Sequence, residues 1–185
     1  ANKLLTAVVN QVTTGQMDQV IPDELSWRKG ITLRDAMNVG AYENKCVPEV
    51  LAGAGKLPSN DEFMEDLLGD DPLGNYNRYS TVANTAALEL DDPDRTVHIS
   101  YGDFPARDYL RDITINRSLG AHDIATFIGV DARFSDELTQ GMWDAISPIA
   151  EYLRDIGVFG PRIEVAEDAP LQERLLGLTG RRPSE

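Results

Sequence analysis

The sequence predicts an all-α fold, a helical bundle with short accessory helices and one or two short strands. Three observations favour this class. Apolar residues recur at helical spacing along most of the 185-residue chain, capping residues precede these stretches, and a single short segment alternates as a strand does. Domains commonly run to roughly 100 to 200 residues, so we expect one helical-bundle domain over residues 1–185.

The first half of the chain predicts four helices. Apolar spacing marks a helix over residues 2–13, after which a capping pattern starts a short new turn. A second helix is expected to run to about residue 51, with Pro48 kinking it or starting a fresh turn. A short helix through residue 68 precedes a long one reaching about residue 90, whose first position is a proline that loses no hydrogen bond. The caps expected for these last three helices are Thr32, Ser59 and Asp71.

The second half predicts one strand, two long helices and a short terminal helix. Residues 96–101 alternate, with Val97 and Ile99 on one side. A helix is expected from Pro105 to Gly129, and another begins at the cap Ser135 and is kinked at Pro148. An extended piece over 162–165 leads to a last helix after Pro170.

The composition excludes several classes of partner. The formal charge is −14, from 17 lysines and arginines against 31 acidic residues, so the molecule repels phosphate backbones and anionic lipids. No stretch approaches the roughly 20 apolar residues that cross a bilayer, and the N-terminus lacks the pattern of a signal peptide. With a single cysteine, Cys46, no internal disulfide forms, and we expect a cytoplasmic protein without nucleic-acid or membrane partners.

Three segments carry a resemblance to a known family. They are ITLRDAMNVGAYENKCVPEVLAG (31–53), DRTVHISYGDFPARDYLRDITINRSLGAHDIATFIG (94–129) and VFGPRIEVAEDAPLQERLLGLTGRRP (158–183). These segments resemble the DinB-like family that includes the actinobacterial mycothiol-dependent maleylpyruvate isomerases. The resemblance implies a DinB-like four-helix bundle, and a role in actinobacterial specialised metabolism.

The same resemblance implies a metal site that this chain has lost. The family holds a divalent metal on three histidines, one in the second helix and two in the fourth. Those positions fall on Val39, Arg117 and Gly120, while His122 and Asp123 replace the family's Trp-Asp pair. Valine and glycine side chains cannot coordinate a metal, and a guanidinium has no lone pair to donate. We therefore expect no metal and no other cofactor.

Arg117 is the most informative of these positions. If it points into the bundle, its charge needs an anionic partner, because an unpaired buried charge costs several kcal/mol. One interpretation is a fixed cation that holds a carboxylate or enolate oxygen of a ligand. The other is a structural ion pair with Asp35, Glu43 or Asp123.

Two further residues are candidates for acid–base catalysis. Glu43 lies one helical turn beyond Val39 on the same side of its helix and acts as a general base if it is desolvated. The imidazole of His122 titrates near neutrality, although such histidines are more often structural. Cys46 is expected to be inert packing. The residues expected to line the pocket are Val39, Tyr42, His98, Tyr101, Gly120, Asp123 and Trp143.

The sequence leaves three hypotheses open. The leading one is a metal-independent isomerase, cyclase or lyase that acts on a small molecule through Arg117, His122 and Glu43. The second is a non-catalytic module in which Tyr101, Tyr109 and Trp143 form a ligand pocket or a homodimer surface. The third keeps a mycothiol-dependent activity through an altered metal site built from Glu43, His122 and Asp123.

Overall fold

The computed structural model describes residues 1–26, 28–54 and 65–183. Its internal contacts divide the chain into two compact units, Ala1–Val130 and Asp131–Glu185. The described residues are mostly helical, which confirms the predicted class, whereas the single domain over 1–185 stays a prediction. Among these residues, no helix combines the length and the apolar character that a membrane span requires.

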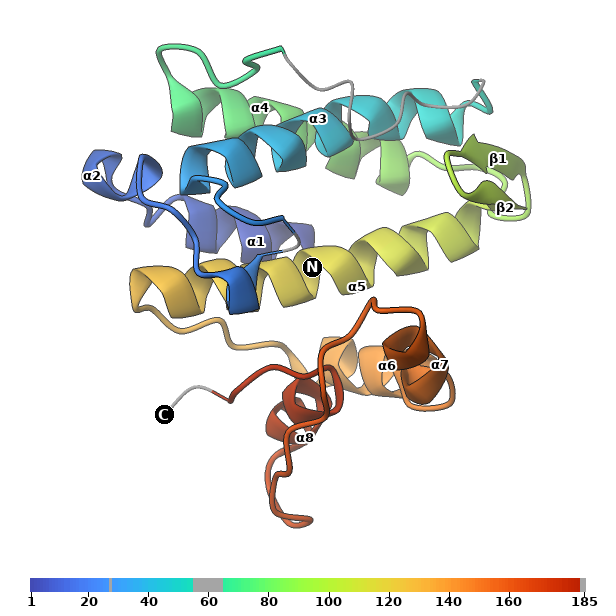
Figure 1. Ribbon diagram of the computed structural model, residues 1–185. Coiled ribbons are helices and arrows are strands. Elements are labelled where there is room, and N and C mark those ends of the chain that lie inside the picture. The colour runs from blue at the N-terminus through green and yellow to red at the C-terminus, as the bar shows by residue number, and fades with distance from the viewer. Residues whose placement is uncertain (27, 55–64, 184–185) are drawn as a thin grey trace. The chain divides into compact units, whose positions relative to one another are not determined.

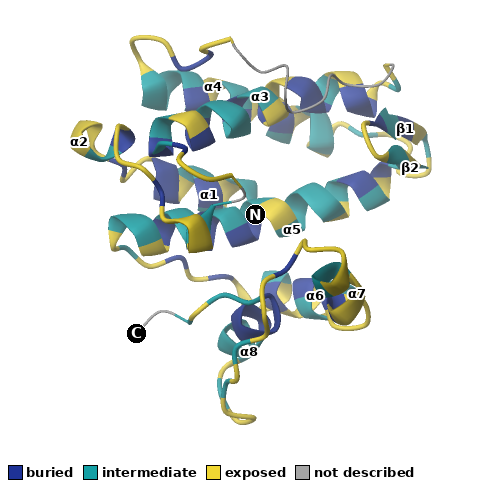
Figure 2. Ribbon diagram, viewed as in Figure 1, coloured by how far each residue is buried: buried dark blue, intermediate teal, exposed yellow. Residues whose placement is uncertain are grey.

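The first unit is built on four helices, α1, α3, α4 and α5, each packed against one or two of the others. Helix α3 packs along α4, α4 also contacts α1, and α1 packs along α5 (Figure 1). Buried and exposed positions alternate around the helices (Figure 2), as amphipathic helices require. The helices of this unit are α1 (Asn2–Val9), α2 (Thr14–Met17), the 3₁₀ turn η1 (Asp23–Leu25), α3 (Leu33–Leu51), α4 (Pro72–Leu88) and α5 (Ala106–Ile128).

The predicted caps fix where these helices begin and end. The Asp35 amide donates to the Thr32 hydroxyl, and the Thr32 amide donates back to the Asp35 carboxylate over 2.9 Å. Asp71 accepts from the Gly74 amide at the start of α4. Helix α5 ends at Gly129, whose φ of +75° is one that glycine adopts without strain.

Two predicted helices are wrong in part. The first ends at Val9 rather than residue 13, because the capping box of Thr13 and Gln16 opens α2 as a separate helix. Of the helix expected over 59–68, positions 59–64 lie outside the described residues, and 65–68 are not helical. In this segment the Asn38 side chain of α3 forms the hydrogen bonds to the backbone: it accepts one from the Leu67 amide and donates one to the Glu65 carbonyl.

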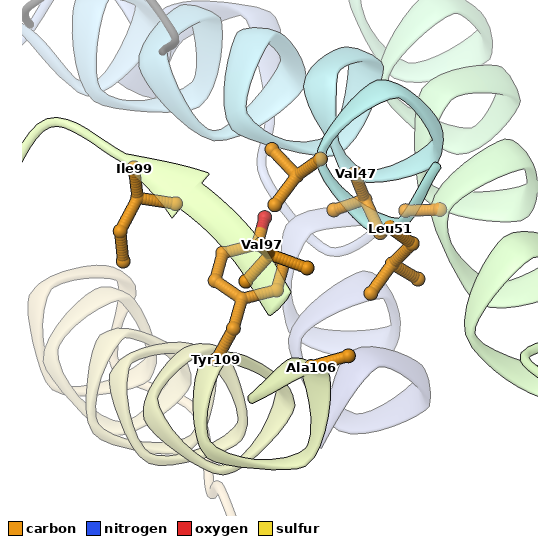
Figure 3. Packing of buried hydrophobic residues seen from close by; sticks show 8 residues of the cluster. Val47, Leu51, Val97, Ile99, Ala106 and Tyr109 are labelled. Atoms are coloured by element: carbon orange, nitrogen blue, oxygen red, sulfur yellow. The ribbon is translucent and has the colours of Figure 1, made fainter. Parts of the chain in front are cut away.

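A two-stranded hairpin joins α4 to α5. Strand β1 (Thr96–Ile99) pairs antiparallel with β2 (Gly102–Pro105). The predicted alternation holds, since Val97 and Ile99 are buried. The second strand had no specific signal, because its four residues include glycine and proline, which strands disfavour. Figure 3 shows β1 with α3 and α5 in one apolar cluster, which includes Val47, Leu51, Val97, Ile99, Ala106 and Tyr109.

The second unit is a smaller helical assembly. Helix α6 (Asp136–Ile146) is capped by Ser135 as predicted, but it ends before Pro148 and α7 (Ala150–Asp155) follows as a separate helix. The extended segment over 162–165 packs on α8 (Leu171–Leu178), with the Ile163 amide bonded to the Gly177 carbonyl over 3.0 Å. A Cβ atom on Gly177 would lie 2.6 Å from the Ile163 carbonyl oxygen, so this approach requires glycine.

Replacing Asp71 tests the energetic role of the α4 cap. The Asp71→Ala variant loses the side-chain acceptor of the Gly74 amide, and the free energy of unfolding is expected to fall by about 1 kcal/mol. Urea denaturation followed by circular dichroism measures the loss. The neighbouring exposed residue gives the control, Asp70→Ala, which should change stability much less; equal losses would show that the cap contributes nothing specific.

Candidate functional site

Arg117 of α5 brings a positive charge close to α3. The side chain is half-buried, and Nη2 donates a hydrogen bond to Oδ1 of Asn44 on α3. Within the described residues Arg117 forms no ion pair, neither with Asp35, Glu43 nor Asp123. Burial lowers the pKa of Arg117, but a guanidinium remains charged at neutral pH. Arg117 is thus a cation held by a neutral amide.

Asn44 of α3 and Tyr76 of α4 lie close to Arg117. Asn44 is 1% exposed, and the Tyr76 hydroxyl of α4 lies beside its amide. The Nδ2 group of Asn44 nevertheless has no hydrogen bond of normal geometry to a described residue. Burial raises the pKa of Tyr76, so its hydroxyl stays protonated. Gly40 leaves room for this ring, since a Cβ atom there would lie 3.3 Å from the Tyr76 ring.

Glu43 of α3 is an exposed residue of the first unit. Loss of hydration nevertheless raises the pKa of its carboxyl, and the nearby Arg117 only partly opposes this shift. No ion pair of Glu43 occurs in the part of the chain that the structure describes. Glu43 and Arg117 are thus opposite charges that influence each other without pairing.

Two tyrosines lie within the electrostatic influence of Glu43. The Tyr109 ring rises from α5 toward Val47 of α3 (Figure 3) and is buried, which raises its pKa. Its hydroxyl has no hydrogen bond to any described residue. Tyr101, in the hairpin turn, is 64% exposed and lies near enough to Glu43 that the carboxylate, after burial and Asp112, helps to raise its pKa. We call Glu43, Asn44, Tyr76, Tyr109 and Arg117 the Glu43–Arg117 site.

Several predicted pocket residues lie on the same helices as this site. Val39 is half-buried one turn before Glu43 on α3. Gly120 lies one turn beyond Arg117, and a Cβ atom there would meet nothing within 4 Å, so open space adjoins this position. Tyr42 bonds to the thiol of Cys46, and burial raises the pKa of that thiol, as expected of an inert cysteine.

Other predicted residues are placed differently. His122 is 1% exposed and packed within the first unit, and Asp123 beside it is half-buried. His98 lies on β1 of the hairpin, and its Nδ1 atom is 2.9 Å from the Asp103 carboxylate. Trp143 belongs to the second unit. There the guanidinium of Arg174 lies 5.0 Å from its ring centre.

Trp143 and Arg174 line a hollow of about 540 Å³ formed by residues of the second unit. Ile163, Val165 and Leu178 supply its apolar wall. Arg162 on its edge is paired with Glu164 at 3.7 Å. Among the charged groups of this hollow, Arg162 and Glu167 are exposed and Arg174 is half-buried.

Sequence reasoning missed Asn44 and Tyr76 and assigned Tyr109 only to a possible binding surface. Asn44 follows Gly40 by one turn, so a small residue and a polar one share a buried helix side. That combination is a usable signal, because a buried amide requires a polar neighbour. Tyr76 carries no such signal, since a tyrosine in an amphipathic helix usually serves as core.

The residues present do not fit the metal that the resemblance implies. Val39, Arg117 and Gly120 offer no donor atom. Among the described residues, no three His, Cys, Asp or Glu side chains lie close enough to hold a metal ion, and this includes the set of Glu43, His122 and Asp123.

The raised pKa of Glu43 predicts a pH-dependent effect of Glu43→Gln. The folded protein binds the Glu43 proton more tightly than the unfolded chain does, so this contribution to stability is full below the unfolded pKa and is lost as the pH rises through the folded pKa. The neutral glutamine avoids that loss. Unfolding in urea at about pH 4 and about pH 8 should show Glu43→Gln gaining stability over the wild type toward the higher pH.

Glu49→Gln, at an exposed position of the same helix, is the matched control and should show a smaller pH-dependent gain. A Glu43→Gln difference that stays constant between the two pH values would mean that Glu43 is fully hydrated in the folded protein.

Comparison of the chain with models of known families, with curated proteins and with solved structures found no match. The assignment to the DinB-like family therefore stays a prediction that rests on the three sequence segments.

Proposed function

We propose that this protein is a metal-independent enzyme of the isomerase, cyclase or lyase type that acts on a small organic acid by proton transfer. One observation carries the proposal: the half-buried guanidinium of Arg117 is bonded to the neutral amide of Asn44 and, within the described residues, forms no ion pair, while Glu43 lies within its electrostatic influence. Titratable groups with shifted pKa values are typical of catalytic sites.

Arg117 supplies the binding charge. A guanidinium presents its N–H groups in a plane that matches a carboxylate, and one of its donors is fixed by Asn44. The remaining donors hold the acid group of the substrate. The same charge stabilises an enolate oxygen as it forms, and such electrostatic stabilisation is often the largest catalytic contribution.

Glu43 supplies the base. Its carboxylate takes a proton from the carbon next to the bound acid group, and the electron pair of that C–H bond moves into the enolate. The proton returns to another carbon in an isomerisation, or the electron pair expels a leaving group in an elimination. In a cyclisation, Glu43 instead deprotonates the attacking group. A raised pKa suits this role, because a base works best when its pKa is near the working pH.

The packing of α1, α3, α4 and α5 supports a DinB-like four-helix bundle as the scaffold. In that scaffold the former metal position corresponds to Val39, Arg117 and Gly120, and a fixed cation replaces the metal charge. A small-molecule substrate, no cofactor and a cytoplasmic setting complete the proposal. A homodimer is compatible with it.

The enzyme proposal predicts proton exchange that depends on both charged residues. The protein is incubated with a panel of small carboxylic acids in D₂O, and deuterium uptake or product formation is followed by NMR and mass spectrometry. Arg117→Met and Glu43→Gln should each reduce the rate by a factor of about 100 or more. Arg78→Met and Glu49→Gln, on exposed positions, should retain it.

Unchanged rates in Arg117→Met would reduce Arg117 to a structural role. If an acid binds and is recovered unaltered and without deuterium, the protein is a binding module, and the enzyme proposal is wrong.

Asn44→Asp tests whether the free charge of Arg117 matters. The new carboxylate would lie beside the guanidinium that now bonds to Asn44, forming an ion pair that occupies the cation. We expect carboxylate binding, measured by calorimetry with the acids of the panel, to weaken by about tenfold or more. The fold should be retained, as circular dichroism can check. Asn84→Asp on α4 adds the same charge elsewhere and should bind normally; equal binding by both variants would contradict this role of Arg117.

A further inference from the structure

We infer that the hollow of the second unit, lined by Trp143 and Arg174, is a separate binding site for a small carboxylic acid with an apolar body. The carboxylate lies on Arg174, and the apolar body lies against the ring of Trp143. The hollow shares no residue with the Glu43–Arg117 site, so this inference does not depend on the proposed function.

The hollow has the size of a small-molecule site. Its volume is about 540 Å³, and ligand pockets commonly measure roughly 300 to 1,000 Å³ and combine apolar walls with a few polar groups. Its lining comes from α6, from α8 and from the segment before α8, and α6 packs against α8 (Figure 1). All of these residues belong to the second unit.

The packing of one segment on α8 fixes the apolar wall. The Ile163 amide donates to the Gly177 carbonyl over 3.0 Å. A Cβ atom on Gly177 would lie 2.6 Å from Cγ2 of Val165, so only glycine allows this approach. Ile163 and Val165 are therefore held beside α8, where both line the hollow together with the buried Leu178.

Arg174 is the group that selects an anion. Its guanidinium lies 5.0 Å from the ring centre of Trp143, and both residues are half-buried. Within the described residues its side chain forms no hydrogen bond and no ion pair. The attraction between a cation and a ring needs no hydrogen bond, so the N–H donors of Arg174 remain for a ligand. Their planar arrangement matches the two oxygens of a carboxylate.

The other charged groups of the hollow leave Arg174 as the cation that gains most from a ligand. Nε of Arg162 lies 3.7 Å from the Glu164 carboxylate, so this arginine already has a partner. Glu167 is exposed, and water hydrates its charge. Arg174 is half-buried and has lost part of its hydration, which an anionic ligand restores. Because Glu167 repels a second negative charge, the hollow favours an acid with a single carboxylate.

The apolar body of the ligand follows from the wall. An acid bound to Arg174 places the rest of its structure beside Trp143, Ile163 and Val165. Burying apolar surface against these side chains adds to the affinity, and an indole ring offers a large area for it. An anion without an apolar part makes only the contact with Arg174.

The test follows the fluorescence of Trp143 in the intact chain. The chain has two tryptophans, so in Trp27→Phe only Trp143 remains. This protein is titrated with 3-phenylpropanoate, cyclohexanecarboxylate and octanoate, each matched with its uncharged amide, and with acetate. At least one of the three acids should change the Trp143 emission to saturation and bind about tenfold or more tightly than its amide and acetate. If none does so, the inference is overturned.

Substitutions in the same background then locate the ligand. Arg174→Met keeps the apolar bulk of the side chain and should weaken binding by about tenfold or more, whereas Arg133→Met, at an exposed position of the same unit, should not. Glu167→Gln changes an exposed residue and should tighten binding about twofold, because a repelling charge is removed. Binding that Glu167→Gln does not tighten would contradict a carboxylate in this hollow.

Arg117→Met separates this inference from the proposed function. This variant removes the cation of the Glu43–Arg117 site and should leave the response of Trp143 as it was. A response that is lost in Arg117→Met and kept in Arg174→Met would assign the acid to the first unit and overturn the inference. Proton exchange that depends on Glu43 and Arg117 tests the proposed function alone, whichever result the hollow gives.

Discussion

The hydrogen bond from Arg117 to Asn44 is the interaction on which the interpretation of this protein depends. It joins α5 to α3 and holds a cation among helices by means of a neutral amide. An ion pair would have cancelled the charge, whereas an amide oxygen stabilises it and leaves it intact. Because the side chain is only half-buried, water shares the cost of desolvation that a sealed guanidinium would carry. The protein thus keeps a positive charge fixed in place and accessible.

The surrounding fold is consistent with maintaining that geometry. At one end, the hairpin strand β1 packs against the end of α3 and the beginning of α5, so apolar contacts hold these two helix ends together through the strand (Figure 3). Further along, Gly40 lets the Tyr76 ring of α4 approach α3 closely. The Tyr76 hydroxyl then lies beside the Asn44 amide and orients it. The oxygen of this amide accepts the hydrogen bond from Arg117. Packing and polar chemistry are therefore coupled through a few residues.

The sequence predicted local structure well wherever a side chain acts on its own backbone. Thr32, Asp71 and Ser135 cap their helices and Gly129 ends α5, because these effects need only neighbours a few residues away. Asn38 shows the limit. Its bonds to residues 65 and 67 replace the expected end of a helix, and no local pattern reports a partner that distant.

The candidate site was only partly predictable. Arg117 and Glu43 were named because the family resemblance puts Arg117 at a former metal position and Glu43 one turn beyond another, Val39, and their roles stay predictions. Asn44 and Tyr76 were not, because their importance comes from meeting across three helices. The bond of His98 to Asp103 was not predicted for a related reason: Asp103 lies on a strand whose glycine and proline concealed it.

The most direct test of the central claim is to observe the Arg117 side chain itself while a small anion is added. Protein labelled with ¹⁵N-arginine is titrated with acetate, and the guanidinium resonances are assigned by comparison with Arg117→Met. The Arg117 signal is expected to shift and saturate at acetate concentrations where exposed arginines such as Arg78 change only in proportion to added salt. An Arg117 signal that follows the exposed arginines would contradict the claim that this cation is held ready for a ligand.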